Sequence, residues 1–80
     1  MTKEEVIKVI KKHILENLED IEEADIDTSK SMKEVGADSL DIIEVVSCSM
    51  RELNIKIPRT ELSEINTIDQ LADKLLEHLN

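Results

Sequence analysis

The 80-residue sequence predicts an all-α fold, a four-helix bundle with three main helices, one short helix and a long loop between the first and second. Three observations support this prediction. Apolar residues recur at helical spacing, no long run alternates between apolar and polar residues, and only one Gly and one Pro interrupt the chain. The length predicts a single domain over 1–80 with a thin core and little room for an enclosed active site.

The first helix is expected to begin at Thr2, because Thr2 and Glu5 have the spacing of a capping box. Its apolar face carries Val6, Ile7, Ile10, Ile14 and Leu18. The helical periodicity fades past Leu18, which predicts a loop over roughly 20–38. We expect four apolar side chains to hold this loop against the core, namely Ile21, Ile26, Met32 and Val35. A loop of this length in a small domain is often functional.

The second helix is expected to begin at Asp38-Ser39 and to end before Pro58, with Asn54 at its exit. The residues expected to form its buried stripe are Ile42, Ile43, Val46, Met50 and Leu53.

A short helical turn is expected from about Thr60 to Ile65. The last helix follows Thr67, which caps it and forms a capping box with Gln70. One face of this helix carries Ile68, Leu71, Ala72, Leu75 and Leu79.

Composition excludes several classes of function. The chain has 19 acidic and 10 basic residues, a net charge of −9 and no aromatic Phe, Tyr or Trp, which argues against nucleic-acid binding and attraction to anionic membranes. No apolar run approaches the length of a membrane span, so we expect no membrane insertion. The N-terminus lacks the apolar stretch of a signal peptide. The single cysteine, Cys48, has no internal disulfide partner, which favours the cytoplasm.

The usual catalytic and metal-binding patterns are missing. The only glycine, Gly36, rules out a glycine-rich phosphate loop. Cys48 lies late in its helix, away from the positive end that would activate a thiol, so we expect it to be inert. His13 and His78 lie on separate helices without metal-ligand spacing and are expected on the solvated surface.

The acidic loop was compared with a calcium-binding EF-hand loop. Asp25, Asp27 and Ser29 fit the first, third and fifth positions. Lys30 and Gly36 then stand where the loop requires glycine and glutamate. We therefore predict no dedicated metal site, and weak divalent-ion binding to the acidic surface stays open.

One segment combines a turn with a serine at a helix entry, Gly36-Ala37-Asp38-Ser39-Leu40-Asp41. The free N–H groups and the dipole at this end of a helix favour a bound anion, such as a phosphate ester on Ser39. The simpler alternative is that Asp38 or Ser39 only caps the helix, and local physics alone favours the cap.

The same segment resembles the modification motif of acyl carrier proteins, G-x-D-S-L. The resemblance extends over essentially the whole chain, with a helix and a long loop before the motif and an aliphatic helix after it. That helix is followed by Ile55-Lys56-Ile57-Pro58, which is similar to the family's I-P exit. Motif and context together favour Ser39 as a modified residue over Ser39 as a cap.

The resemblance implies that Ser39 carries a 4′-phosphopantetheine arm, which a separate phosphopantetheinyl transferase moves from coenzyme A with Mg²⁺. The arm ends in a thiol that holds acyl groups as thioesters. The carrier is not an enzyme but presents its cargo to an acyltransferase, a ketosynthase or related enzymes of fatty acid or polyketide biosynthesis. We expect a freestanding monomer.

In the family, the helix after the motif is the main recognition surface. The resemblance therefore implies that partners contact Asp38, Leu40, Asp41, Glu44, Ser47 and Arg51. Arg51 and Arg59 stand where the fatty-acid carriers usually have acids, and Ser47, Cys48 and Ser49 are also untypical of them. The tail from Ile57 to Asp73 is similar to freestanding carriers of polyketide assembly lines, so the polyketide pathway is slightly favoured.

An aliphatic and methionine-containing core without aromatic rings reshapes easily around a guest chain. We expect an acyl chain on the arm to be lined by Ile43, Val46, Met50 and Leu71. The alternative is that these are ordinary packed side chains. Two other classes of function stay open, an unmodified acidic interaction module and a carrier of amino or aryl acids.

Overall fold

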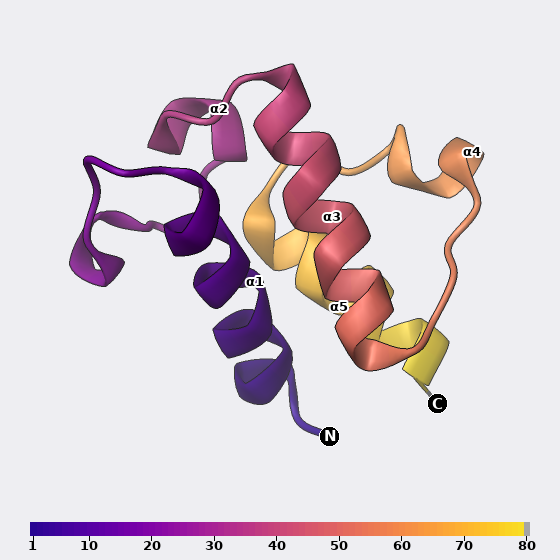
Figure 1. Ribbon diagram of the computed structural model, residues 1–80. Coiled ribbons are helices and arrows are strands. Elements are labelled where there is room, and N and C mark those ends of the chain that lie inside the picture. Colours follow the sequence, from indigo (N-terminus) through magenta and orange to yellow (C-terminus); the bar gives the residue numbers. More distant parts are fainter. Residues whose placement is uncertain (80) are drawn as a thin grey trace.

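The computed structural model describes residues 1–79, and every regular element among them is helical (Figure 1). The three main helices are α1 (Lys3–Asn17), α3 (Ser39–Leu53) and α5 (Ile68–Leu79). The short elements are α2 (Met32–Val35), α4 (Arg59–Leu62) and the 3₁₀ turn η1 (Glu23–Asp25). The all-α prediction is confirmed, and the expected short helix begins slightly earlier and ends earlier than the range from Thr60 to Ile65.

The core lies where α1 packs against both α3 and α5. Val6, Ile10 and Ile14 of α1 are fully buried, as are Val45 of α3 and Leu75 of α5. Thr2 caps α1 through the expected capping box with Glu5. Each of the three amphipathic helices thus buries one face in a shared core.

The segment over 20–38 is more regular than the loop that the sequence predicts. It contains η1 and α2, and Ser31 caps α2 in a capping box with Glu34. Ser31 and Glu34 have the same spacing as Thr2 and Glu5, so the signal for α2 was present in the sequence. Ile26 and Met32 are buried as expected, and the Ile68 amide donates to the Lys30 carbonyl oxygen at 3.0 Å, which ties the segment to the start of α5.

The prediction for the buried stripe of α3 is wrong at Ile43, which is 57% exposed. The residues that α3 buries fully are Val45 and Ser49, four positions apart on the side that meets α1. Ile42, Val46, Met50 and Leu53 are only half-buried. The hydrophobic pattern did not predict that Ser49 is buried. Its hydroxyl donates to the Val45 carbonyl oxygen at 2.8 Å, so no unpaired polar group enters the core.

His13 is also buried, contrary to the prediction of a solvated surface position, while His78 is half-buried. The two ring nitrogens of His13 each lie 2.9 Å from a carboxylate oxygen, Nε2 from Glu52 of α3 and Nδ1 from Glu16 of α1. The contact with Glu52 is a hydrogen bond that joins the two helices. Hydrogen bonds from Lys12 and then from His13 lower the pKa of Glu52, and the cluster links α1 to the end of α3.

The second histidine cluster holds α4 against α5. His78 Nε2 lies 3.2 Å from Glu61 Oε1, and Lys74 Nζ lies 3.5 Å from the same oxygen. The hydrogen bond with His78, with a smaller contribution from Lys74, lowers the pKa of the Glu61 carboxyl.

The helix α3 ends as expected at Asn54, whose φ of 57° is left-handed. In the segment that follows, the Ile57 amide contacts Met50 Sδ at 3.4 Å. The Glu61 contacts thus hold α4 against α5, and the Ile57 contact holds the segment before α4 beside α3.

A matched pair of substitutions tests which side of α3 is buried. Val45→Ala removes two carbons from the contact with α1, and we expect it to lower the free energy of unfolding by about 2 kcal/mol. Ile43→Ala removes more carbon from an exposed position, and we expect a change below about 0.5 kcal/mol. Urea unfolding followed by circular dichroism measures both. Equal losses in the two variants would contradict the burial described here.

Candidate functional site

The turn between α2 and α3 depends on a glycine. Gly36 has a φ of 124°, a conformation that side chains with a Cβ rarely adopt. Its amide donates to the Met32 and Lys33 carbonyl oxygens, and the Ala37 amide also donates to the Met32 carbonyl oxygen, at 2.9 Å. Ala37 is buried against the core. The turn is therefore fixed on both sides, and it sets where α3 begins.

Asp38, and not Ser39, is the N-cap of α3. The Asp41 amide donates to Asp38 Oδ1 at 2.9 Å, and the Asp38 amide donates to Asp41 Oδ2 at 3.1 Å, which completes a capping box. Ser39 is the first residue of the helix and is exposed. Within residues 1–79 no hydrogen bond engages its hydroxyl. The aspartates take the capping role and leave the serine hydroxyl accessible.

The position of Ser39 suits a phosphate ester. The first N–H groups of an α-helix have no partner inside the helix, and the helix dipole places partial positive charge at that end. A phosphate group joined to Ser39 Oγ would lie beside these groups. The neighbouring carboxylates of Asp38 and Asp41 already accept hydrogen bonds from the backbone. The residues present thus fit a phosphate-linked group at this serine.

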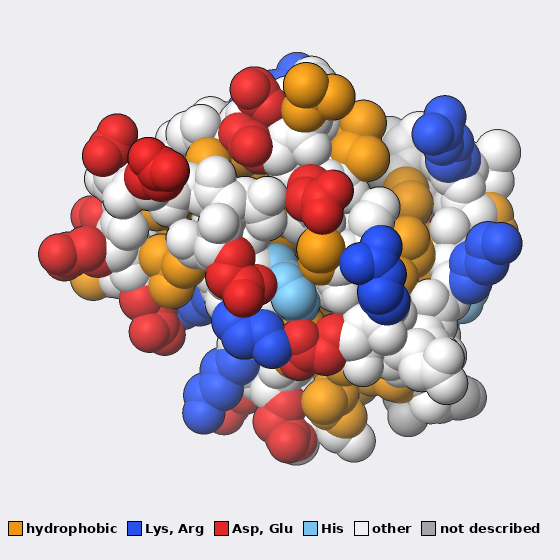
Figure 2. Space-filling model, in the orientation of Figure 1, with side chains coloured by type: hydrophobic (Ala, Val, Ile, Leu, Met, Phe, Trp, Pro, Cys, Tyr) orange, Lys and Arg blue, Asp and Glu red, His pale blue; other side chains and the backbone are white. Residues whose placement is uncertain are grey.

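The surface beside Ser39 is both apolar and acidic. Leu40 is 77% exposed, and Asp38 and Glu44 are also exposed, whereas Asp41 is half-buried in its capping box. Figure 2 shows acidic and apolar side chains together at the top of the molecule, where α3 begins in Figure 1. Arg51 lies exposed near the other end of the same helix. The structure therefore leaves most of the expected contact residues accessible.

Cys48 has the environment of an unreactive thiol. Its Sγ donates to Glu44 Oε1 at 3.3 Å, and this hydrogen bond, with burial and the nearby negative charge, raises the pKa of the thiol. The thiolate is the nucleophilic form of cysteine, so a raised pKa lowers reactivity at neutral pH. This result agrees with the expectation of an inert Cys48.

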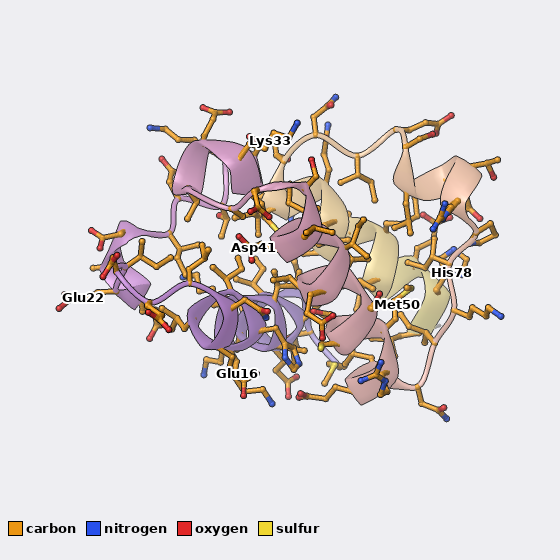
Figure 3. All side chains as sticks on the ribbon, turned by 45° about the horizontal axis from the view of Figure 1, so that its top comes forward. Glu16, Glu22, Lys33, Asp41, Met50 and His78 are labelled. Carbon is orange, nitrogen blue, oxygen red and sulfur yellow. The ribbon has the colours of Figure 1, made fainter. Side chains whose placement is uncertain are left out.

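A groove of about 1000 Å³ lies between α3 and the segment that contains α4, with α2 at one end. We call it the α3–α4 groove. The four residues expected to line an acyl chain, Ile43, Val46, Met50 and Leu71, all line it. Ser47, expected among the partner contacts, lines it as well. Figure 3 shows Lys33 and Met50 on the two helices α2 and α3 that border it.

Sequence reasoning missed the second wall of this groove. It is formed by residues in and around α4, including Ile57, Arg59, Leu62 and Ile65. The signal for it was the run of apolar residues spaced through 57–65, which is too short and irregular to show a helical face. Ile43 faces this groove and is exposed, whereas Val46 and Met50 are half-buried because they lie between the groove and the core.

The acidic segment before α2 forms hydrogen bonds within itself. Asp27 Oδ1 accepts from the Ser29 hydroxyl at 2.6 Å and from the Ser29 amide at 3.0 Å, and these bonds lower the pKa of Asp27.

Over residues 1–79 no group of three or more His, Cys, Asp or Glu side chains has an arrangement that holds a metal ion. In the same part of the chain no helix has the length and apolar character needed to cross a membrane.

Comparison with known proteins agrees with this site. The family described as "Phosphopantetheine attachment site" matches residues 8–75. The chain is 32% identical to the polyketide biosynthesis acyl-carrier-protein AcpK of Bacillus subtilis (strain 168) over 77 residues, which cover 96% of this chain and 94% of AcpK. It is also 32% identical to an acyl carrier protein of Cyanidioschyzon merolae (strain NIES-3377 / 10D) over 79 residues, 98% of this chain and 86% of the relative. No solved structure matches the chain.

These matches define the class of protein as one that carries a phosphopantetheine arm. More particularly, the chain belongs to the acyl carrier protein family. Its cofactor is 4′-phosphopantetheine, whose terminal thiol holds an acyl group as a thioester. Membership of this family implies a phosphopantetheinyl transferase and biosynthetic enzymes as partners.

Two substitutions at adjacent positions separate the cap from the free hydroxyl. We expect Asp38→Ala to lower the free energy of unfolding by about 1 kcal/mol, because the helix loses its N-cap. We expect Ser39→Ala to change it by less than about 0.5 kcal/mol, because the hydroxyl bonds to nothing in the fold. Thermal and urea unfolding of the two variants provide the measurement. A loss in Ser39→Ala as large as that in Asp38→Ala would show that Ser39 has a capping role.

Proposed function

We propose that Ser39 is the residue that carries the 4′-phosphopantetheine arm, within an acyl carrier domain that spans 1–80. The observation that supports this most is the exposed Ser39 hydroxyl, which is free of hydrogen bonds at the first position of α3 while Asp38 caps the helix. Modification of such a serine removes no contact from the fold. The buried Ser49, in contrast, uses its hydroxyl within α3 and is closed to a modifying enzyme.

In the transfer reaction, a bond forms between Ser39 Oγ and the phosphorus of the phosphopantetheine portion of coenzyme A. The bond from that phosphorus to the oxygen of the adenosine 3′,5′-bisphosphate portion breaks, and this portion leaves. The proton of the serine hydroxyl passes to a base of the transferase. The carrier contributes the accessible hydroxyl and the fixed helix end, and the transferase supplies the catalytic groups.

The carrier itself performs no catalysis in this proposal. Its partners are the transferase and then an acyltransferase, a ketosynthase or related enzymes, and it works with them as a monomer in the cytoplasm. Asp38 and Glu44 offer exposed acids to basic surfaces of these enzymes, while Leu40 offers an exposed apolar contact beside Ser39. Complementary charge mainly sets the rate of encounter and the choice of partner. Asp41, Ser47 and Arg51 complete the expected contact set.

We place the protein in polyketide biosynthesis in preference to fatty acid biosynthesis. The similarity to AcpK over nearly the full length of both chains supports this assignment. So do Arg51 and Arg59, two exposed cations on a chain whose net charge is −9. A partner surface that is uniformly basic would meet Arg51 with repulsion, so Arg51 is suited to a partner with a mixed surface.

The α3–α4 groove is the expected resting place of the acyl chain. Ile43, Val46, Met50 and Leu71 provide its apolar lining, and the groove volume lies in the range of small-molecule sites. Flexible Met50 and the aliphatic neighbours can repack around chains of different shape. The short helix α4 contributes Arg59 and Leu62 to the second wall of the groove.

Intact mass spectrometry tests the modification directly. We expect the unmodified protein, incubated with coenzyme A, Mg²⁺ and a phosphopantetheinyl transferase of broad specificity, to gain the mass of one phosphopantetheine. Ser39→Ala should gain nothing, whereas Ser29→Ala, which removes another exposed serine, should be modified like the parent protein. Failure of the folded parent protein to gain the arm, or modification of Ser39→Ala, would refute the proposed role of Ser39.

A further inference from the structure

The α3–α4 groove has an electrostatic character opposite to that of the whole protein. The chain carries a net charge of −9, yet the charged residues that line the groove are two cations, Lys33 and Arg59, and one acid, Glu34. Glu34 Oε1 accepts a hydrogen bond from the Ser31 amide at 3.3 Å, so its carboxylate is directed to the capping box of α2. The charged lining therefore sums to one positive charge, although the whole chain is strongly negative.

Neither cation is used by the fold. Among residues 1–79 the basic side chains in ion pairs with carboxylates are Lys3, Lys12, Lys74 and the two histidines. Lys33 and Arg59 are both exposed and make no such pair in that part of the chain. Arg59 opens α4 directly after Pro58, on the wall that faces the apolar stripe of α3. Its charge is thus available to a ligand in the groove.

The groove also has polar groups along the same wall. Ser63 and Asn66 line it together with Leu62 and Ile65. The wall formed by α3, in contrast, is mostly apolar, with Ile42, Ile43, Val46 and Met50. A simple alkyl chain would contact the apolar residues of both walls but would offer no partner to the charge of Arg59. A chain with an apolar middle and an anionic oxygen group at its far end complements both walls.

We propose that the α3–α4 groove selects acyl groups that carry a carboxylate away from the thioester, and that Arg59 is the residue that recognises this carboxylate. The proposal rests on the proposed function, because the acyl group reaches the groove on the arm of Ser39. A guanidinium group can donate two parallel hydrogen bonds to one carboxylate, which makes Arg59 the better recognition residue of the two cations. Lys33 adds charge at the α2 end of the same groove.

The test compares two cargoes of equal carbon number, hexanoyl and adipoyl, which end in a methyl group and in a carboxylate. Each is loaded from its coenzyme A thioester by the transferase, and intact mass confirms the acylated protein. Hydroxylamine then attacks the thioester carbonyl, forms the hydroxamic acid and releases the thiol of the arm. Cargo held in the groove keeps the thioester close to the protein and slows this cleavage.

We expect Arg59→Gln to accelerate cleavage of the adipoyl form by about two- to fivefold, the value of one solvent-accessible ion pair. The hexanoyl form of the same variant should cleave at the parent rate. The matched control is Lys56→Gln, which removes an exposed positive charge that is not part of the groove and should leave both rates unchanged. Added salt should accelerate only the adipoyl form of the parent protein.

Equal effects of Arg59→Gln on the two cargoes, or equal effects of Arg59→Gln and Lys56→Gln on the adipoyl form, would overturn the proposal. Both substitutions are at exposed positions, and circular dichroism verifies that each variant is folded. The loading step separates this proposal from the proposed function. A protein that gains no acylated arm refutes the role of Ser39, whereas a protein that loads both cargoes and shows no dependence on Arg59 refutes only the selectivity.

Discussion

The capping box at the start of α3 is the constraint on which the site depends. A helix that begins at an exposed turn needs partners for its first amides, and a serine at that point commonly supplies one. Here the side chains of Asp38 and Asp41 each accept a hydrogen bond from the other's backbone amide. The positive φ of Gly36 forms the turn that brings Asp38 to the start of α3. Ser39 is then the one hydroxyl at the helix entry that the fold does not use. Under the proposed function, helix capping by Asp38 and modification at Ser39 fall on adjacent residues and do not compete for one side chain.

A second feature is that two sides of α3 have different surroundings, the core at α1 and the α3–α4 groove. Val45 and Ser49 meet α1 in the core, while the side that carries Val46 and Met50 faces the α3–α4 groove. The far wall is held by the Glu61 cluster, by the contact from the Ile57 amide to Met50 and by the packing of Ile57 in the core. The helix that bears Ser39 thus meets the core on one side and lines the groove on the other.

Sequence reasoning predicted the elements that depend on local patterns. The three main helices, the cap at Thr2, the start of α3 at Asp38-Ser39 and the exit at Asn54 could all be predicted from spacing or motif. Ile43, Ser49 and His13 could not be placed correctly, because their burial depends on which side of a helix meets a neighbour and on whether polar groups find partners there. The second wall of the α3–α4 groove, which includes Arg59 and Ile65, depends on how the segment around α4 packs beside α3. No local sequence pattern predicts that packing.

The most direct test of the central claim is fragmentation of the modified protein by tandem mass spectrometry, which locates the arm on one residue. The chain contains other exposed hydroxyl groups, including those of Ser29, Ser63 and Thr60. The position of the arm therefore distinguishes Ser39 from other accessible acceptors. We expect every fragment that carries the phosphopantetheine to contain Ser39, with the flanking fragments unmodified. An arm found on any other hydroxyl would contradict the assignment of cap and acceptor to Asp38 and Ser39.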